Sequence, residues 1–543
     1  MSAGAITMSA PAETEFSGSS RERLLQSTSV VGSMTLLSRV LGLARDIALS
    51  NWFGAGVVMD AFTVAFKIPN LLRRFFAEGA FSQAFVPVIA EYRANRTAAE
   101  TRELIDQVAG TLGALLLAAT LIGVLAAPAL ILIFAPGFVG DSERFTTATA
   151  MLRFTFPYLV FISLTALSGA ILNIHRRFAV AAFTPVLLNV VLIGFAGWVD
   201  PKLGRPGLGL AAGVLAAGIV QLGFQIPFLA RLGVLPRPRW GWAHEGVRRI
   251  LRLMLPAVFG SSVAQVSILL DTLVASFLAA GSISWLYYSN RLVEFPLGVF
   301  GVATATVILP RLSEHHARAS GEPFAATLDW ALRLVIVIAV PAAVGLVLLA
   351  EPLMATLFYR GEFGMRDVDM AAASLVAYAP GLMGFVLVKV LSPGYFSRQD
   401  TRTPVRAGIQ ALGLSMVLNV VFVLVLLRTG WAPPHAGIAA ATACSGLFNA
   451  SLLLVGLVRS GVYRPRAGWQ RFCIQVAGAS FVMGAVLHLA LGALGSWLLL
   501  GGFVRVLALL GCVGGGALVY CGAGYLFGLR LDALRISPAG QRP

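Results

Sequence analysis

The sequence predicts an all-α protein that crosses a membrane many times. Of its 543 residues, 57% are hydrophobic and only 12% are charged, and the mean hydropathy is +0.82. A soluble protein typically carries about twice that charged fraction, roughly 25%. The apolar residues also form runs that are long enough to cross the hydrocarbon core of a bilayer as helices. These observations together predict a polytopic membrane protein.

A window of about 20 residues identifies roughly fourteen candidate transmembrane helices. They lie near residues 24–50, 59–90, 104–134, 146–174, 180–199, 207–230, 250–280, 283–314, 327–351, 370–397, 404–428, 436–458, 472–494 and 499–529. The first twenty residues are polar and contain no apolar core of a cleaved signal peptide. We therefore expect the first span to act as an uncleaved anchor.

Two pairs of short motifs suggest an internal repeat. Ala84–Glu91 and Val307–Glu314 both end in Pro-x-x-x-Glu, and a Thr-Pro pair followed by Asn-Val-Val occurs at Thr184 and again at Thr403. The copies are six spans apart, and this even number gives them parallel topology, which suits two lobes that rock about a shared site. A chance match in a biased sequence is the alternative. The predicted division is a polar tail (1–20), an N-terminal lobe (21–232), a C-terminal lobe (233–461), and two further spans with a cytoplasmic tail (462–543).

The basic residues predict the orientation of the bundle. By our count, the loops on the N-terminal side carry roughly 25 Arg and Lys, against roughly 6 on the other side, so both termini are expected in the cytoplasm. The net charge of +16 then reflects topology and contact with anionic lipid headgroups. No nucleic-acid partner is predicted, because the arginines are scattered among loops.

Charged residues inside the spans are the main functional signal. Each costs about 2.5–3.5 kcal/mol at the bilayer centre, so such residues rarely persist without a polar role. The second span carries Asp60, Lys67, Arg73, Arg74 and Glu78. Four of these, spaced by seven, seven and four, fall on one stripe of a helix. We expect this stripe to face a polar cavity; an ion-pair network that locks helix packing is the alternative.

The first and eighth spans carry similar polar faces. On the first span the spacing of four, three and four places on one face Thr35, Arg39, Gly42 and Asp46, with Arg45 beside them. On the eighth span one side presents Tyr287, Asn290, Arg291 and Glu294. Arginine predominates among these charges, and its planar fork binds phosphate in a bidentate manner. Across the three spans, six cations modestly outnumber four acids, which predicts an anionic ligand such as a diphosphate, unless all the charges are mutually paired. The cations are Arg39, Arg45, Lys67, Arg73, Arg74 and Arg291, and the acids are Asp46, Asp60, Glu78 and Glu294.

Four segments resemble the MurJ (MviN) family of bacterial lipid II flippases, which belongs to the MOP exporter superfamily. They are SRVLGLARD (Ser38–Asp46), FKIPNLLRRFFAEGAFSQAFVPVIAEY (Phe66–Tyr92), NRLVEFPLGVFGVATATVILPRLSE (Asn290–Glu314) and VKVLSPGYFSRQDTRTPV (Val388–Val405). The resemblance implies two six-helix lobes around a central cavity, and two C-terminal helices that form a groove for a lipid tail. It implies a transporter of the inner membrane without a cofactor, with lipid II as cargo and bilayer lipids and the cell-wall synthesis machinery as candidate partners.

The resemblance also suggests roles for individual residues. It implies that the substrate is bound by Arg39, Arg45, Arg73 with Arg74 beside it, and Arg291. It implies that the acids of the cavity are Asp46, Asp60, Glu78 and Glu294. Asn290 departs from relatives that have aspartate there, and this puts a proton-carrying role at this position in doubt. Some members bind sodium near an acid of the seventh span; Asp271 is the candidate here, without further ligands that the sequence identifies.

Several functional alternatives stay open at this stage. A drug antiporter of the same superfamily would need an acidic excess in its cavity, and a polysaccharide-unit flippase is a second related carrier. An enzyme that acts on lipid-linked sugars would need a catalytic acid at the outer surface, where Glu362, Asp367 and Asp369 are the candidates. The energy source is expected to be an unidentified ion gradient or the membrane potential, which supplies about 2.3 kcal/mol per charge per 100 mV.

Overall fold

The computed structural model describes residues 18–73, 80–298, 312 and 321–529. In these residues the chain forms helices and short connections and contains no β-strand, which confirms the predicted all-α class. The first group of helices contains α1 (Gly18–Phe53), α2 (Val57–Arg73), α3 (Ala80–Asn95), α4 (Ala98–Leu125), α5 (Ala127–Phe134), α6 (Ser142–Thr155), α7 (Tyr158–Ile174), α8 (Phe178–Gly194) and α9 (Leu208–Arg231).

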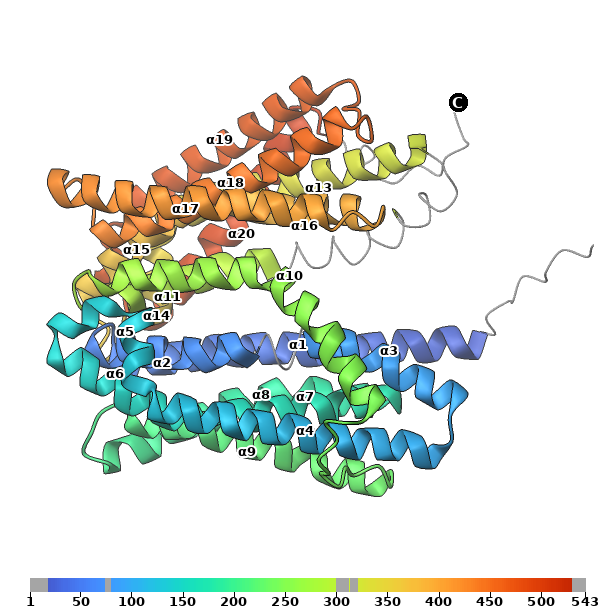
Figure 1. The fold of residues 1–543 in the computed structure, drawn as a ribbon. Helices are drawn as coiled ribbons and strands as arrows, with labels where there is room; N and C mark the ends of the chain where they lie inside the picture. The colour runs from blue at the N-terminus through green and yellow to red at the C-terminus, as the bar shows by residue number, and fades with distance from the viewer. Residues whose placement is uncertain (1–17, 74–79, 299–311, 313–320, 530–543) are drawn as a thin grey trace, which may run out of the picture.

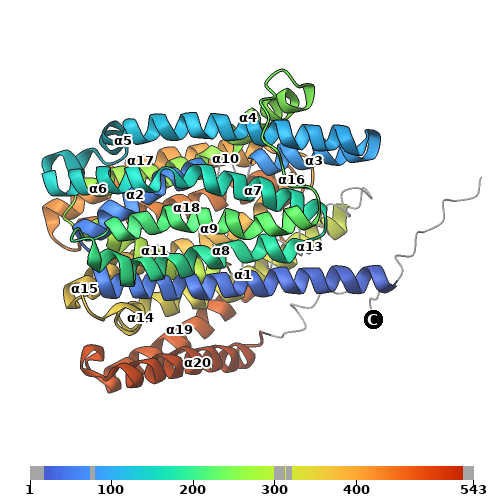
Figure 2. The same cartoon turned by 90° about the horizontal axis from the view of Figure 1, so that it is seen from below.

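The second group contains α10 (Glu245–Ser276), α11 (Ser282–Pro296), α13 (Gly321–Leu348), α14 (Ala350–Phe358), α15 (Met365–Tyr378), α16 (Gly381–Phe396), α17 (Arg402–Thr429) and α18 (Pro434–Arg459). The two groups form two lobes that lie side by side (Figure 1). Helix α10 links them, because it contacts α3 of the N-terminal lobe and α17 of the C-terminal lobe. The last pair, α19 (Trp469–Leu494) and α20 (Gly502–Leu526), lies at one edge of the bundle (Figure 2).

The spans are apolar enough to cross a membrane. Among the described residues, nine helices are long and apolar enough to span a bilayer. Helices α15 and α16 meet at a bend of 45°, and they make a tenth span if they are taken together. The count of fourteen stays a prediction, because the expected second and eighth spans run through residues 74–79 and 299–311, which lie outside the described residues. Helix α1 is long enough, but it carries Arg39, Arg45 and Asp46 within its apolar half.

Proline and glycine explain several breaks that the sequence windows did not resolve. The expected span 104–134 is α4 followed by α5, and Pro128 stands in the first turn of α5. The expected span 146–174 is divided between α6 and α7 at Phe156 and Pro157, and Pro380 separates α15 from α16. Gly281, with φ +96°, forms the turn that separates α10 from α11.

The two lobes use equivalent asparagines to join equivalent helices. Asn189 on α8 donates a hydrogen bond to the carbonyl of Ser38 on α1 at 3.2 Å. Asn419 on α17 donates to Asp271 Oδ1 on α10 at 2.7 Å. In each lobe the asparagine therefore ties the fifth predicted span to the first. This parallel is consistent with the repeat at the Thr-Pro motifs, although the lobe boundaries remain predictions and Val307–Glu314 lies mostly outside the described residues.

Helices α19 and α20 are held against α13 and α14. The Tyr520 hydroxyl donates to the Val337 carbonyl at 2.8 Å, and the Trp497 indole donates to Thr356 Oγ1 at 2.9 Å. At the other end of α19, the Trp469 indole donates to buried Asp329 of α13 at 2.7 Å. These contacts make the terminal pair an extension of the C-terminal lobe.

Candidate functional site

An open cavity of about 1950 Å³ lies between the two lobes. On the side of the N-terminal lobe, the cavity is lined by α1, α2, α7, α8 and α9. On the side of the C-terminal lobe, it is lined by α11, α13, α14 and α16, and it extends between α13, α14, α19 and α20. Pockets for small molecules typically measure about 300–1,000 Å³, so this cavity accommodates a larger ligand. Its position between the lobes agrees with the site that the polar faces of the first and eighth spans predict.

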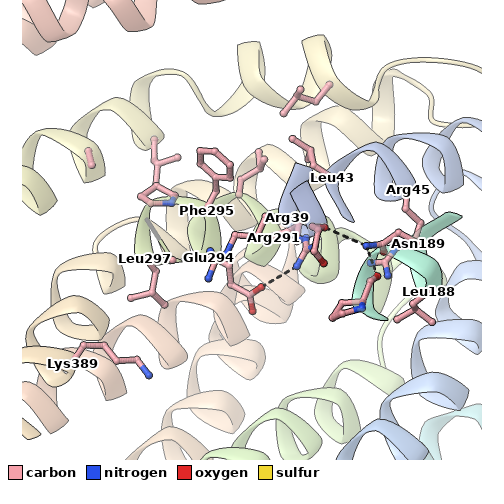
Figure 3. A pocket seen from close by; sticks show the side chains of 18 of the residues that line it. Arg39, Leu43, Arg45, Leu188, Asn189, Arg291, Glu294, Phe295, Leu297 and Lys389 are labelled. Atoms are coloured by element: carbon pink, nitrogen blue, oxygen red, sulfur yellow. Dashed lines mark hydrogen bonds and ion pairs between the residues drawn. The ribbon is translucent and has the colours of Figure 1, made fainter. Parts of the chain in front are cut away.

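Four of the five predicted arginines line this cavity. They are Arg39, Arg45, Arg73 and Arg291. Figure 3 shows Arg39, Arg45 and Arg291 gathered beside Asn189. The side chain of Arg73 donates from Nε to Asn70 Oδ1, another cavity residue, at 2.8 Å. The fifth arginine, Arg74, and the predicted acid Glu78 lie outside the described residues.

A single buried carboxylate holds two of these arginines. Asp46 is fully buried, and its Oδ1 accepts hydrogen bonds from Arg45 Nη2 at 2.7 Å and from the Tyr287 hydroxyl at 2.8 Å. Its Oδ2 lies 2.8 Å from Arg291 Nε. Asp46 comes from α1, whereas Tyr287 and Arg291 come from α11, so this cluster joins the two lobes. Two guanidinium groups share this carboxylate, and the excess positive charge of the cavity comes from Arg39 and Arg73, which also line it.

Glu294 and Asn290 extend the same cluster along α11. Arg291 Nη1 lies 3.5 Å from Glu294 Oε2, and Asn290 Nδ2 donates to Glu294 Oε1 at 3.0 Å. Glu294 lines the cavity, and its side chain is half exposed. The expectation that Tyr287, Asn290, Arg291 and Glu294 share one side of the helix is confirmed.

Two glycines leave room for arginines. The guanidinium of Arg39 occupies the space beside Gly298, where a methyl group would collide with it. The guanidinium of Arg291 covers Gly42 in the same way. Because both contacts run between α1 and the segment that contains α11, small residues at these positions allow the arginines to reach across the lobe interface.

Asp60 and Lys67 do not line the cavity, and this corrects the expectation of a charged stripe facing it. Asp60 is fully buried and accepts hydrogen bonds from the backbone amides of Gly281 and Ser284, both at 2.8 Å, and from Ser284 Oγ at 2.5 Å. It therefore caps the N-terminus of α11. Lys67 Nζ donates to Thr272 Oγ1 on α10 at 2.8 Å. The spacing correctly predicted that both side chains share a face of α2, but that face packs against the C-terminal lobe.

Further contacts between the lobes lie near Asp60. The amide of Glu362, in the connection between α14 and α15, donates to the carbonyl of Asn51 at the end of α1 at 3.0 Å. Within the C-terminal lobe, Asp367 accepts hydrogen bonds from the Trp285 indole at 2.8 Å and from the Gly364 amide at 3.0 Å. This acid, which an enzymatic alternative would use, therefore has a structural role at the N-terminus of α15.

The sodium candidate Asp271 has oxygen-bearing neighbours that the sequence alone did not identify. Besides Asn419, Thr442 Oγ1 donates to its Oδ2 at 3.2 Å. The buried Oδ1 of Asn419 has no hydrogen-bond partner among the described residues. Hard cations prefer carboxylate, amide and hydroxyl oxygens. This donor set therefore fits a hard cation, whereas the residues that the structure describes contain no cluster of three or more His, Cys, Asp or Glu.

Sequence reasoning missed a polar wall on the N-terminal lobe. Its cavity-lining members are Tyr158, Asn173, Thr184, Gln221 and Gln225, and Lys389 lines the opposite lobe. The signal was present, since Gln221 and Gln225 stand four residues apart in an apolar span and so share a face of α9. Amides are less conspicuous than charges, and for this reason the search for intramembrane charges passed over them.

Comparisons with known proteins agree with this geometry. A family model described as "Lipid II flippase MurJ" matches residues 49–508. The "Probable lipid II flippase MurJ" of Vibrio cholerae serotype O1 is 49% identical over 521 residues, which cover 95% of this chain and 98% of that protein. A solved structure of "Lipid II flippase MurJ, inward closed conformation" has 26% identity and a TM-score of 0.77, and the match covers 93% of this chain and 99% of that one.

The same fold occurs in a more distant transporter. An inward-facing multidrug resistance MATE family transporter of the MOP superfamily matches with a TM-score of 0.63 and 16% identity, over 80% of this chain and 98% of that one. This likeness concerns the fold alone. The family model and the extensive identity with the Vibrio protein identify the chain as a multi-pass membrane protein that belongs to the MurJ family.

Proposed function

We propose that this protein moves lipid II, the undecaprenyl-diphosphate-linked disaccharide pentapeptide, from the cytoplasmic to the outer leaflet of the bacterial inner membrane. The observation that carries the proposal is the cavity shared by both lobes, in which Arg39, Arg45, Arg73 and Arg291 line the wall. The protein is a transporter and not an enzyme. Lipid II and the surrounding bilayer lipids are its partners, together with the enzymes of cell-wall synthesis that make and use lipid II.

The arginine cluster suits the diphosphate of this cargo. Guanidinium groups donate two parallel hydrogen bonds to phosphate oxygens and stay charged when they lose water. Asp46 neutralises only some of the charge of Arg45 and Arg291, and it fixes their orientation from the side away from the cavity. A diphosphate that enters the cavity therefore supplies the negative charge that the cluster lacks.

The extension of the cavity suits the prenyl tail. Its walls between α13, α14, α19 and α20 are apolar and include Leu346, Leu349, Leu353, Leu487 and Leu509. These side chains offer the tail an apolar surface like that of the bilayer hydrocarbon, so the tail avoids water and the arginines while the headgroup is bound. The headgroup and the tail of one lipid-linked molecule thus have separate, chemically matched regions.

Alternating access requires contacts that open at one end of the cavity. The interlobe contacts of Asp60 with the start of α11, and of Asn51 with Glu362, are the proposed gate at the outer side. The distribution of basic loops supports this placement, because it predicts that both termini lie in the cytoplasm. Helix α1 would then start on the cytoplasmic side and reach the outer side at its end, near Asn51. Release of the cargo to the outer leaflet would break these contacts.

The coupling energy is proposed to come from the membrane potential or from a cation gradient. The oxygens of Asp271 on α10, Asn419 on α17 and Thr442 on α18 would hold such a cation. Its positive charge would attract these oxygens and so draw the three helices together. The unpaired Asn419 Oδ1 supports this proposal, because a buried acceptor that has no partner among the described residues is costly.

Transport of labelled lipid II in liposomes tests the function. Purified protein is reconstituted, and the outer-leaflet fraction of the lipid is followed over time. We expect translocation with the unaltered protein and none with Arg291→Ala, while undecaprenyl-linked products of altered mass should not form. Product formation would identify an enzyme, and equal transport with both proteins would show that the arginine cavity is not the path.

A further inference from the structure

The polar wall of the N-terminal lobe contains a buried amide, Gln225, that contacts among the described residues leave incompletely satisfied. Gln225 of α9 lines the cavity and is 1% exposed. Its Nε2 donates to Thr184 Oγ1 at 3.1 Å, and its buried Oε1 has no hydrogen-bond partner among the residues that the structure describes. If the amide is turned by 180°, the nitrogen becomes the atom without a partner, so the conclusion does not depend on that assignment.

The neighbouring glutamine shows what a purely structural amide looks like at this wall. Gln221, one turn earlier on α9, donates from Nε2 to the carbonyl of Thr184 at 2.9 Å, and its Oε1 lies 3.5 Å from the Tyr158 hydroxyl. Both polar atoms of this side chain are thus engaged, and it ties α9 to α8. Gln225 makes one such contact and presents its second polar atom to no other described side chain.

The space around Gln225 is compatible with an approaching ligand group. Gly169 on α7 also lines the cavity, and a Cβ atom at this position would lie 3.7 Å from Gln225 Nε2. Glycine therefore keeps the approach to the amide wider than any other residue would. A buried polar group that is paired only when a ligand is present is a typical basis of selectivity, because analogues that lack the matching group leave it unpaired.

The amide wall and the arginine cluster share helix α8. Asn189 Nδ2 and the Arg291 guanidinium both lie within 4 Å of the space above Gly42, so this end of the wall belongs to the phosphate-binding region. Thr184, the partner of Gln225, stands five residues earlier on α8. This spacing corresponds to about 7 Å along the helix axis, on the order of the length of one sugar residue.

We propose that Gln225 recognises an amide group of the cargo headgroup, such as the acetamido group of a sugar or a peptide group next to it. The arginines bind the charged diphosphate, and Gln225 binds a neutral, hydrogen-bonding group that lies one sugar length away. This inference rests on the proposed function, since it assigns a second subsite for the same lipid-linked molecule.

Binding of two lipids to the purified protein tests the proposal. One probe is lipid II, and the other is undecaprenyl diphosphate, which has the charged group and the tail but no sugar or peptide. We expect Gln225→Met, which keeps the size of the side chain, to weaken lipid II binding by about tenfold and to leave undecaprenyl diphosphate binding unchanged. Gln225→Asn, which shortens the amide, should show the same selective loss if the Met variant does not fold.

The controls separate this inference from the proposed function. Arg291→Ala should weaken the binding of both probes, and Gln221→Met should lower thermal stability without selectivity between the probes. If Gln225→Met and Gln225→Asn lower the affinity for both lipids equally, or for neither lipid, the proposal of a headgroup subsite at Gln225 is wrong. If Arg291→Ala leaves both affinities unchanged, the phosphate site of the proposed function is wrong, whatever the Gln225 variants show.

Discussion

Arg291 Nε on α11 lies 2.8 Å from Asp46 Oδ2 on α1, so an ion pair with a buried carboxylate and a partly exposed guanidinium joins the two lobes beside the cavity. The carboxylate also holds Arg45, and it is the one acid within ion-pair distance of both arginines among the described residues. A carrier whose lobes rock must loosen or rearrange this contact, and a phosphate that binds the arginines competes with Asp46 for them.

Asp46→Asn is expected to destabilise the protein and to abolish transport. The substitution leaves two guanidinium groups without their carboxylate, and removing one partner of a buried pair costs about 3–5 kcal/mol. Thermal unfolding in detergent measures the loss of stability. Tyr287→Phe is the matched control, because it removes the two hydrogen bonds of the hydroxyl, with Asp46 and with Arg45, each worth about 1 kcal/mol, and leaves the charges in place. Equal effects of the two variants would contradict the role of the charge.

Replacing Arg39, Arg45, Arg73 or Arg291 with alanine is expected to abolish transport while the protein remains inserted in the membrane, and at Arg45 and Arg291 also to lower thermal stability, because Asp46 then loses one of its two cationic partners. Deleting an intramembrane charge removes an insertion cost, but it also removes a phosphate-binding fork. Lysine should restore only a fraction of the activity, because a point charge does not reproduce bidentate contact. Complementation and membrane abundance are measured together. Variants that disappear from the membrane would instead indicate an ion-pair network that stabilises helix packing.

Gly298→Ala and Gly42→Ala are expected to reduce transport by displacing an arginine. A methyl group at Gly298 collides with the guanidinium of Arg39, and one at Gly42 collides with that of Arg291. Gly32→Ala on α1 is the control, because nothing lies within 4 Å of its added methyl group. The transport rate in liposomes is measured for each of the three variants, and the prediction fails if the rates of Gly298→Ala and Gly42→Ala equal that of Gly32→Ala.

The sequence predicted the polar faces better than their surroundings. The spacing of charges placed Asp46, Arg291 and Glu294 correctly on inward faces, since helical periodicity determines which residues share a side. It did not determine what that side contacts. Asp60 therefore appeared to belong to the cavity, whereas it caps α11 in the other lobe. Gln225 was missed because the search for intramembrane charges passed over amides, although its spacing from Gln221 was visible; that its Oε1 lacks a partner among the described residues is known only from the structure.

Sodium is expected to stabilise the protein through the site around Asp271. A cation that binds only the folded state raises the unfolding temperature with its concentration. Melting is measured in sodium chloride and in choline chloride at equal ionic strength. Asp271→Asn and Thr442→Val should each reduce the difference between the two salts, whereas Thr429→Val, on the exposed end of α17, should not. The same difference in all variants would exclude this site.

Asp60→Asn is expected to favour opening at the outer end of the cavity. The carboxylate accepts three hydrogen bonds at the N-terminus of α11, where the helix dipole favours a negative charge. An asparagine lacks the charge, and its NH₂ group cannot accept from a backbone amide. The loss of a cap costs about 1 kcal/mol, which corresponds to a shift of roughly fivefold toward the open form. Ser284→Ala removes only the side-chain bond and should cause a smaller shift.

The opening can be followed with a cysteine at Ala280, next to the turn that Asp60 holds. The four native cysteines are first replaced by serine, so that an impermeant maleimide reports position 280 alone. Asp60→Asn should label faster than the parent protein, Ser284→Ala should be intermediate, and a saturating phosphate-bearing lipid should change all three rates. Identical labelling under every condition would argue against a gate at this end of the cavity, and a static groove between the lobes would then explain transport better than alternating access.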